Sequence, residues 1–424
     1  MRIVFSTYGT FGDVNPLVAL CLELKRRGHR PVLAIPEMFR PKIEPLGIDF
    51  VPVRPVQDPN DTRLIAMIYD IRHGTEVGLR EFLFPSLRDS YDDLTAAVRA
   101  DGGADLLVTG ELAYAAPLVA EKTGIPWVSY VLAPFSFFSA YDPPVLPPYP
   151  TLAKMQSGFP PLGHVVARFA RLVTRKWPEP IYALRRELGL PRGRDPIFDA
   201  KHSDRLALAL FSPVMGRPQP DWPHSVKTTG FAFYDGTGSE GNLPPELAAF
   251  LDAGAPPLVF TLGSAAVMHA GDFYEQSAQA AEILGQRAVL LIGADDRNQP
   301  KRKLPGTICV TRYAPYSKIF PRASVLIHQG GIGTVAQALR AGRPMLIMPY
   351  SHDQPDNARR VRRLGVAEVL TRKRYKAKAA ARLIWQLLSD NAYQVRATAI
   401  ATQIAAERGA ETACDALELV RSRG

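Results

Sequence analysis

Short apolar runs alternate with helical segments along most of this chain. In the first half, the runs that predict strands are residues 2–6, 31–35, 50–53, 106–109, 127–132 and 206–211. In the second half, they are residues 258–262, 289–292, 308–311, 325–328, 345–348 and 368–370. Strands that alternate with helices form parallel βαβ units. The pattern therefore predicts an α/β fold with two doubly wound halves.

Start and stop signals mark the first helix. Asn15 can cap its N-terminus, Pro16 suits the first helical position, and Gly28 follows a basic last turn. At the other end of the chain, residues 402–420 are rich in Ala, Glu and Leu and predict a helix.

Residues 213–245 contain no long periodic run and are rich in Pro and Gly. This composition is typical of a loop or linker. We therefore expect a first domain at 1–232, a linker at 233–245, a second domain at 246–405 and a terminal helix at 406–424.

A long irregular segment, residues 134–161, interrupts the first half. It combines many prolines with aromatic residues, among them Phe135, Phe138 and Tyr141. A loop of this length is typically functional or partly mobile. Its aromatic side chains can form a pocket wall, and the alternative is ordinary packing onto the first domain.

Composition and cysteine content are those of an intracellular globular protein. Hydrophobic residues make up 46% of the 424 residues and charged residues 22%. We find no apolar run of the roughly 18 residues needed to span a membrane. Three cysteines, Cys21, Cys309 and Cys414, are widely spaced, which fits free thiols in a reducing compartment. The expected location is the cytoplasm.

The net charge of +10 could serve binding to nucleic acid, to a membrane surface or to an anionic substrate. Much of the excess lies at residues 359–363 and 372–374, which contain seven Arg and Lys residues. A solvated helix face is the simplest interpretation, and contact with a membrane surface is the alternative. We find no nucleic-acid-binding motif.

The most informative stretch is His328–Thr334, with the sequence HQGGIGT. It follows an apolar strand and precedes a helical run. Glycines let the backbone approach an anion, and the free N–H groups of a helix N-terminus point at it. The spacing matches neither the Walker loop nor the dinucleotide fingerprint. The stretch therefore predicts a phosphate site of another kind.

The first strand ends in a similar glycine-containing turn that carries an acid. Gly9 and Gly12 remove side chains near the strand end, and Asp13 lies just before a helix N-terminus. Asp13 can cap that helix, since acids are favourable there by about 0.3–1 kcal/mol. Because Asn15 offers a cap of its own, Asp13 can instead serve another role.

Polar residues follow several other strands of the second half. Ser264 offers a hydroxyl, Tyr313 can stack on a base, and Asp353 with Gln354 can bind the hydroxyls of a sugar ring. Open parallel sheets bind ligands at the carboxyl ends of their strands. The sequence thus predicts one ligand site built from successive strand ends.

These residues and others resemble a known family. The stretches that carry the resemblance are Gly12-Asp13-Val14, Gln219-Pro220-Asp221-Trp222-Pro223, Gly271-Asp272-Phe273-Tyr274, Gly330-Gly331-Ile332-Gly333 and His352-Asp353-Gln354. The chain resembles the nucleotide-sugar glycosyltransferases of family 1, which have the GT-B fold of two Rossmann-like domains facing a cleft. It is similar to the bacterial branch, above all to the rhamnosyltransferase B chains of rhamnolipid synthesis.

The resemblance implies a role for each matching residue. The residues implied in donor binding are Gly12, Ser264, Tyr313, Ala314, His328, Gly330, Gly331, Gly333, Thr334, Asp353, Gln354 and Asn357. Asp13 occupies the position of the base that activates the acceptor. Residues that would line the acceptor pocket are Phe11, Phe135, Phe138, Tyr141 and Phe169. The first domain would bind the acceptor, the second the donor, and the terminal helix would pack back toward the first.

The implied reaction is an inverting, metal-independent transfer of a sugar. The donor would be dTDP-rhamnose or another dTDP- or UDP-sugar, a co-substrate with no further cofactor. The acceptor would be a hydroxyl of a lipid, a polyketide or a flavonoid-like phenol. Many eukaryotic members place a His–Asp dyad where this chain has Asp13 and Glu111, so Asp13 would act alone. The alternatives are a UDP-hexose-dependent glucosyltransferase, a GT-B epimerase or hydrolase, and a non-catalytic homologue that binds a partner enzyme.

Overall fold

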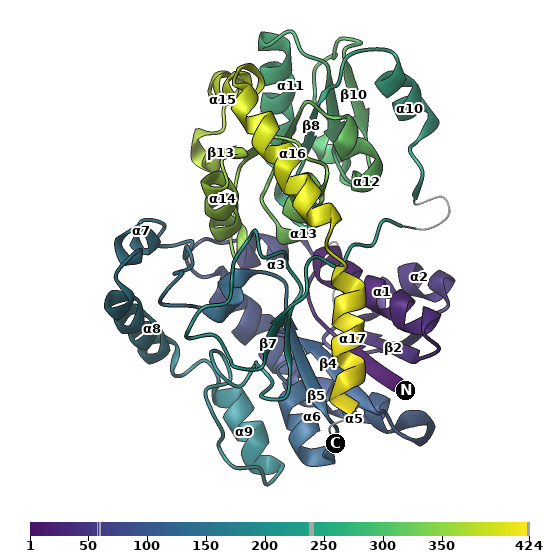
Figure 1. Cartoon of the computed structure of the whole chain (residues 1–424), viewed down its shortest axis with the longest axis vertical. Coiled ribbons are helices and arrows are strands. Elements are labelled where there is room, and N and C mark those ends of the chain that lie inside the picture. Colours follow the sequence, from purple (N-terminus) through teal and green to yellow (C-terminus); the bar gives the residue numbers. More distant parts are fainter. Residues whose placement is uncertain (57, 59–60, 237–240, 422–424) are drawn as a thin grey trace. The chain divides into compact units, whose positions relative to one another are not determined.

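The computed structural model describes residues 1–56, 58, 61–236 and 241–421, and it contains two compact units (Figure 1). Unit 1 comprises Met1–Tyr234 with Arg408–Gly424, and unit 2 comprises Asp235–Glu407. The boundary between them lies within the segment expected to be a linker. Residues 237–240 of that segment and residues 422–424 of the expected terminal helix lie outside the described residues.

Unit 1 contains a seven-stranded parallel sheet in the order β3-β2-β1-β4-β5-β6-β7. Its strands are β1 (Arg2–Ser6), β2 (Arg30–Ile35), β3 (Asp49–Pro52), β4 (Leu106–Gly110), β5 (Trp127–Val131), β6 (Ala207–Ala209) and β7 (Val226–Thr228). Six of them match predicted strands. Strand β7 was not predicted, because this edge strand has three half-buried residues and no apolar run.

Helices cover both faces of this sheet. Ile3 and Phe5 of β1 share a core with α1 (Phe11–Arg26) and α17 (Gly409–Arg421). Val4, which points to the opposite face, shares a second core with α5 (Leu87–Arg99) and α6 (Ala116–Thr123). Parallel strands buried on both faces are apolar along their whole length, which explains why they were predictable.

Unit 2 repeats this architecture with a six-stranded parallel sheet in the order β10-β9-β8-β11-β12-β13. Its strands are β8 (Leu258–Thr261), β9 (Ala288–Leu291), β10 (Ile308–Thr311), β11 (Val325–His328), β12 (Met345–Ile347) and β13 (Ala367–Val369). All six coincide with predicted strands. The predicted α/β class with two parallel sheets is therefore confirmed.

The other α-helices are divided between the two units. In unit 1 they are α2 (Arg40–Ile43), α3 (Thr62–Ile68), α4 (Gly74–Val77), α7 (Leu152–Gln156), α8 (Pro160–Thr174) and α9 (Glu179–Glu187). In unit 2 they are α10 (Pro245–Asp252), α11 (Phe273–Ile283), α12 (Tyr316–Ile319), α13 (Ile332–Arg340), α14 (Gln354–Arg363), α15 (Ala377–Ser389) and α16 (Asn391–Ala405). None of the helices among the described residues has the length and apolar character needed to span a membrane.

The N-terminus of α1 differs from the prediction. The helix begins at Phe11, four residues before Asn15, and its cap is Thr10. The Thr10 hydroxyl accepts a hydrogen bond from the Gly12 N–H at 3.1 Å. Pro16 therefore lies inside the helix, within its first two turns. The predicted Asn15 cap was wrong because the Thr-x-x-Asp pattern, a capping box, starts the helix earlier.

The predicted helix over residues 402–420 was also wrong as a single element. The structure ends α16 at Ala405 and begins α17 at Gly409. A Cβ atom on Gly409 would lie 2.2 Å from the Phe231 carbonyl oxygen. The start of α17 is therefore in direct backbone contact with residue 231 of unit 1, and only glycine fits at position 409.

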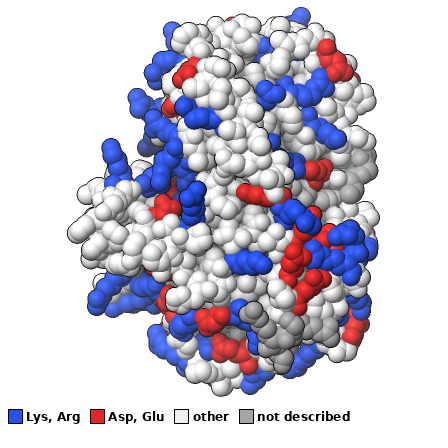
Figure 2. Space-filling model, viewed as in Figure 1, with Lys and Arg blue, Asp and Glu red and all other residues white. Residues whose placement is uncertain are grey.

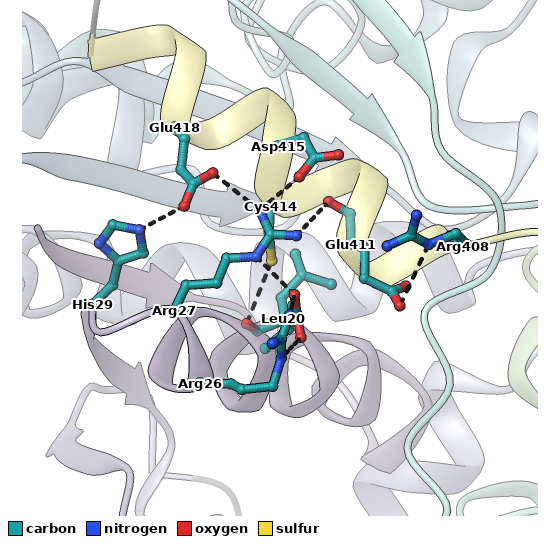
Figure 3. A network of polar contacts seen from close by, with 10 residues as sticks. Leu20, Arg26, Arg27, His29, Arg408, Glu411, Cys414, Asp415 and Glu418 are labelled. Atoms are coloured by element: carbon teal, nitrogen blue, oxygen red, sulfur yellow. Dashed lines mark hydrogen bonds and ion pairs between the residues drawn. The ribbon is translucent and has the colours of Figure 1, made fainter.

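Ion pairs hold α17 on α1 within unit 1 (Figure 3). Arg27 donates to Asp415 at 2.6 Å and to Glu418 at 3.0 Å. His29 Nε2 lies 2.7 Å from the Glu418 carboxylate. Because the Arg27 side chain is mostly buried and bridges two acids, this contact is stronger than an isolated surface pair. The last helix of the chain is thus an integral part of unit 1.

Candidate functional site

The predicted anion turn of unit 2 has an uncapped helix N-terminus. Strand β11 ends at His328, α13 begins at Ile332, and among the described residues no side chain caps it at the Gly331 position. Gly330 has φ +88°, and a Cβ atom there would lie 2.8 Å from Ile347. The first N–H groups of α13 therefore lack a side-chain partner, as in anion-binding sites at helix N-termini.

His328 adds a buried hydrogen-bond donor to this turn. Its side chain is fully buried, and Nδ1 accepts a hydrogen bond from the Gly330 N–H at 3.0 Å. Burial lowers the pKa of His328 to about 3, so the ring is neutral and its proton lies on Nε2. That Nε2 atom has no hydrogen-bond partner among the described residues. A buried donor without an acceptor is costly, and a phosphate oxygen would satisfy it.

Residues at the start of α14 form hydrogen bonds with the glycine turn and with one another. Asn357, fully buried, donates to the Gly330 carbonyl at 3.0 Å and to Asp353 Oδ2 at 2.7 Å. Gln354 Oε1 accepts from the Tyr350 N–H at 2.9 Å. The predicted residues Asp353, Gln354 and Asn357 are thus brought beside the glycine turn. The single side-chain oxygen of Gln354 already accepts a backbone hydrogen bond, which leaves its NH2 group for a ligand.

Gln329, for which the sequence suggested no role, connects two glycine turns. Its Nε2 lies 3.4 Å from Thr334 Oγ1, and the side chain is buried. A Cβ atom on Gly263, which has φ +67°, would lie 2.3 Å from Gln329 Nε2, and one on Gly331 would lie 2.9 Å from it. Gln329 therefore packs between the turn after β8 and the turn after β11. No sequence signal could have found this contact, because it joins residues far apart in the chain.

Tyr313 follows β10 and Ser264 follows β8, and both residues are exposed to solvent. The Tyr313 ring is 58% exposed, and Ser264 is exposed in the turn after β8. Ala314 beside Tyr313 is fully buried. Nearby, the Tyr316 hydroxyl and Thr261 Oγ1 form a hydrogen bond of 2.8 Å, which links α12 to the end of β8. The strand ends of unit 2 thus carry an aromatic side chain, a hydroxyl group and a glycine turn with an uncapped helix N-terminus.

Unit 1 carries Asp13 in the third position of α1. Its Oδ2 accepts hydrogen bonds from the Thr10 N–H at 2.7 Å and the Thr10 hydroxyl at 3.2 Å. Burial raises the pKa of Asp13 to about 6, the hydrogen bonds from Thr10 oppose that rise, and the charge of Glu111 adds to it. Asp13 therefore does cap its helix, and it is also a carboxylate whose pKa lies near neutral pH, as a general base requires.

Gly9 makes room for this carboxylate. Its φ is +126°, and a Cβ atom there would lie 2.3 Å from Asp13 Oδ2. Any other residue at position 9 would have to displace the acid.

Glu111 follows β4 and pairs with residues other than Asp13. Its carboxylate accepts from Ser136 Oγ at 2.6 Å and from Lys201 Nζ at 2.7 Å. Burial would raise the pKa of Glu111, but the Lys201 ammonium and these hydrogen bonds outweigh it, so the pKa is lowered. Glu111 is thus a charged structural partner, and its charge acts on Asp13 only at a distance.

The aromatic residues expected at an acceptor site lie in several places on unit 1. Phe135 and Phe138 have ring centroids 5.3 Å apart, and Phe138 also contacts Phe198. Tyr141 meets His164 edge to face at 5.9 Å. Phe11, the first residue of α1, packs edge to face on Phe39. Phe169 is 64% exposed on α8. The structure therefore groups Phe135 with Phe138 and turns Phe169 to solvent.

Within the described part of the chain, no group of three or more His, Cys, Asp or Glu side chains is placed to hold a metal ion. The polar groups that gather at the strand ends are instead donors and carboxylates suited to a phosphorylated, hydroxylated ligand.

Comparison with known sequences places the chain among glycosyltransferases. Residues 278–419 match the family of the erythromycin biosynthesis protein CIII-like C-terminal domain. The O-mycaminosyltylonolide 6-deoxyallosyltransferase of Streptomyces fradiae is 32% identical over 99% of this chain and 97% of its own length. The vancomycin aglycone glucosyltransferase of Amycolatopsis orientalis is 30% identical over 86% of this chain and 85% of its own length.

A solved structure shares the whole fold. The spinosyn rhamnosyltransferase in complex with thymidine diphosphate superimposes with a TM-score of 0.70, covers 99% of this chain and all of its own, and is 18% identical. That likeness shows a common fold with two Rossmann-like domains. The near full-length match at 32% identity shows common descent. This chain therefore belongs to the family 1 glycosyltransferases of the GT-B fold.

Proposed function

We propose that this protein moves a deoxysugar, such as rhamnose, from a dTDP- or UDP-linked donor to a hydroxyl of a small hydrophobic acceptor, with inversion at the anomeric carbon. One observation carries the proposal. The buried Nε2–H of His328 lacks a partner beside the uncapped N-terminus of α13. Two unsatisfied sets of donors at one turn fit the diphosphate of a nucleotide sugar.

The rest of unit 2 would hold the remainder of the donor. Tyr313 would stack on the base, with the Ala314 backbone beside it, and Ser264 would assist the diphosphate together with Gly333 and Thr334. Asp353 would accept hydrogen bonds from sugar hydroxyls, with Gln354 as a second partner. A relative whose name specifies a 6-deoxyallosyl group and a structural neighbour crystallised with thymidine diphosphate support a dTDP-deoxysugar as the donor.

Asp13 would act as the base. As the acceptor oxygen bonds to the anomeric carbon, its proton would pass to the Asp13 carboxylate and the diphosphate would leave on the opposite face. A carboxylate is weakly basic toward an alcohol, so it takes the proton late, in the transition state. Its hydrogen bonds with Thr10 hold it in one orientation.

The developing charge of the leaving diphosphate would be stabilised by His328 and by the α13 N-terminus. Because these donors are fixed before the reaction, they stabilise that charge without reorganisation. We propose that this replaces a metal ion, and turnover should therefore persist in the presence of a strong chelator.

The acceptor would be a lipid, a polyketide or a phenol. The paired rings of Phe135 and Phe138, with Tyr141 nearby in sequence, support an apolar acceptor on unit 1. The relatives named for a tylonolide and for a vancomycin aglycone act on natural products, which supports a polyketide or peptide-like acceptor over a primary metabolite.

The test is a panel of dTDP- and UDP-sugars incubated with the full chain and with a macrolide aglycone, a hydroxy-fatty acid and a flavonoid. We expect a product whose mass increases by one sugar, and NMR should show the inverted anomer. Glucosyl transfer from UDP-glucose alone would assign the alternative donor. Release of free sugar or of an epimer, with no acceptor modified, would refute transfer.

A further inference from the structure

A helix on unit 1 exposes its apolar side instead of burying it. Four large apolar side chains of α8, Val165, Phe169, Leu172 and Val173, are each more than half exposed. They recur at the spacing of one helical face. The helix itself lies at the outer side of unit 1, next to α7 (Figure 1). An exposed apolar stripe of this kind on a folded unit marks an interaction surface.

The opposite side of α8 is fixed to the protein. A Cβ atom on Gly163 would lie 2.7 Å from the Ala140 Cα atom, so the two backbones are in close contact. Arg171 makes two hydrogen bonds with Asp199, of 2.6 and 3.0 Å, and its guanidinium lies 4.9 Å from the Phe198 ring. The apolar face is therefore presented by an anchored helix.

The exposed face continues onto α7 and the segments around it. Tyr149, Met155 and Phe159 are each about 60% exposed or more. We call the surface formed by these three residues and the four apolar residues of α8 the α7–α8 face.

The segment that carries this face has basic residues and no acidic ones. Residues 143–178 contain no Asp or Glu, and their basic residues are Lys154, Arg168, Arg171, Arg175 and Lys176. All of these except Arg171 are exposed. The surface on the left where α7 and α8 lie is mainly white, with Lys and Arg at its lower edge (Figure 2). Apolar side chains combined with cations suit an anionic lipid surface.

The basic run that suggested a membrane in the sequence has partners of its own. Arg360 is buried and forms an ion pair with Asp356 at 2.6 Å. Arg372 lies 4.5 Å from the Tyr350 ring, and Arg362 lies 3.5 Å from Glu368. The run at residues 359–374 is therefore used in part within unit 2, and the α7–α8 face is the better lipid-binding surface.

We propose that the α7–α8 face docks on anionic membranes. The apolar side chains would enter the boundary between headgroups and acyl chains, while Arg168, Arg175 and Lys176 would contact lipid phosphates. A second copy of the chain is a poorer occupant, because a two-fold interface would bring the same cations of both copies together. The proposal does not depend on the proposed sugar transfer. Phe169 is the one residue of the face that the resemblance implied at the acceptor site, and no variant below changes it.

The test is sedimentation of the full chain with vesicles of phosphatidylglycerol and phosphatidylcholine, compared with vesicles of phosphatidylcholine alone. We expect binding to the anionic vesicles that weakens as salt is added, and at least about tenfold weaker binding to the neutral ones. Equal binding to both vesicles, or to neither, would overturn the proposal.

Variants locate the surface. The double variant Val165→Ser/Leu172→Ser should bind anionic vesicles about tenfold more weakly, because it loses two inserted apolar groups. The matched control is Trp385→Ser/Val395→Ser, which removes two equally exposed apolar side chains of unit 2 and should bind as wild type does. A control that loses binding to the same extent would remove the α7–α8 face from the account.

Charge and self-association are tested separately. Arg168→Gln/Arg175→Gln should reduce binding to anionic vesicles about tenfold, whereas Lys301→Gln/Lys303→Gln, two exposed lysines of unit 2, should not.

Light scattering gives the oligomeric state. A wild-type dimer that Val165→Ser/Leu172→Ser converts to a monomer would assign the face to a second copy and contradict the lipid proposal.

Discussion

The turn after β1 in unit 1 and the turn after β11 in unit 2 each lead from an inner strand of a parallel sheet into a helix, yet their helix N-termini are opposite in character. In unit 1, Thr10 caps α1 and Asp13 completes a capping box, so the protein's own carboxylate satisfies the helix end. In unit 2, the N-cap residue of α13 is Gly331, and no side chain among the described residues caps the helix.

This difference decides which ligand each turn can take. An N-terminus that already holds a carboxylate repels a second anion, whereas an uncapped one attracts it. In the proposed reaction, the same kind of strand–turn–helix element would thus serve a base and a neutral acceptor in unit 1, and a diphosphate in unit 2. The residues that make this difference are few, so substitutions can exchange or remove it.

The largest effect is expected from Asp13→Asn. The amide oxygen can still accept a hydrogen bond from Thr10, so the helix cap should survive, but no proton can be taken from the acceptor. We expect turnover to fall about 100-fold or more with unchanged affinity for nucleoside diphosphate.

Asp61→Asn is the matched control, because Asp61 caps α3 through the Leu64 N–H at 2.9 Å. It makes the same chemical change at another helix N-terminus of unit 1 and should leave turnover near that of wild type. Wild-type turnover in Asp13→Asn itself would exclude Asp13 as the base.

Gly331→Asp should convert the open turn into a capped one. The new carboxylate would accept from the first N–H groups of α13 and repel the diphosphate. We expect calorimetry to show about 30-fold weaker binding of nucleoside diphosphate. Gly331→Ala, which adds a methyl group without charge, should cost about threefold or less, and an equal loss in both variants would point to a steric cause.

His328→Ala removes the buried donor. A hydrogen bond to a charged group contributes about 1.5–3 kcal/mol, so we expect at least about tenfold weaker diphosphate binding. His202→Ala is the control, since this second buried histidine, on unit 1, also has a lowered pKa and a ring nitrogen without a partner among the described residues. It should destabilise the protein without changing that affinity.

The smallest effect is a pH dependence from Asp13. The base must be ionised, and burial raises its pKa to about 6. The value of kcat/KM should therefore be half its plateau near pH 6 and fall about tenfold per unit below that. Asp13→Asn should lack this limb. A wild-type profile that stays flat down to about pH 5 would contradict the assignment.

Most of the fold could be predicted because buried parallel strands contain continuous apolar runs, such as residues 325–327 of β11. The uncapped glycine turn before α13 was also predictable, since its glycines and histidine are local in sequence. The Thr10 cap was missed although its Thr-x-x-Asp signal was present, because Asn15 and Pro16 offered a competing helix start.

Other features depend on packing that no local pattern reports. The Gln329 side chain fits where it does because Gly263, in the turn after β8, and Gly331 have no side chains in its way. Phe169 was expected to line a pocket, but apolar periodicity does not say whether another element covers the helix face, and here it lies exposed. The sequence thus predicts which side chains lie on one face and leaves open what that face contacts.

Calorimetric titration of a nucleoside diphosphate into wild type, Asp13→Asn and Gly331→Asp tests the contrast between the two turns most directly. The account predicts equal affinity for wild type and Asp13→Asn, and about 30-fold weaker binding for Gly331→Asp. Unchanged affinity in Gly331→Asp, or a comparable loss in Asp13→Asn, would contradict it.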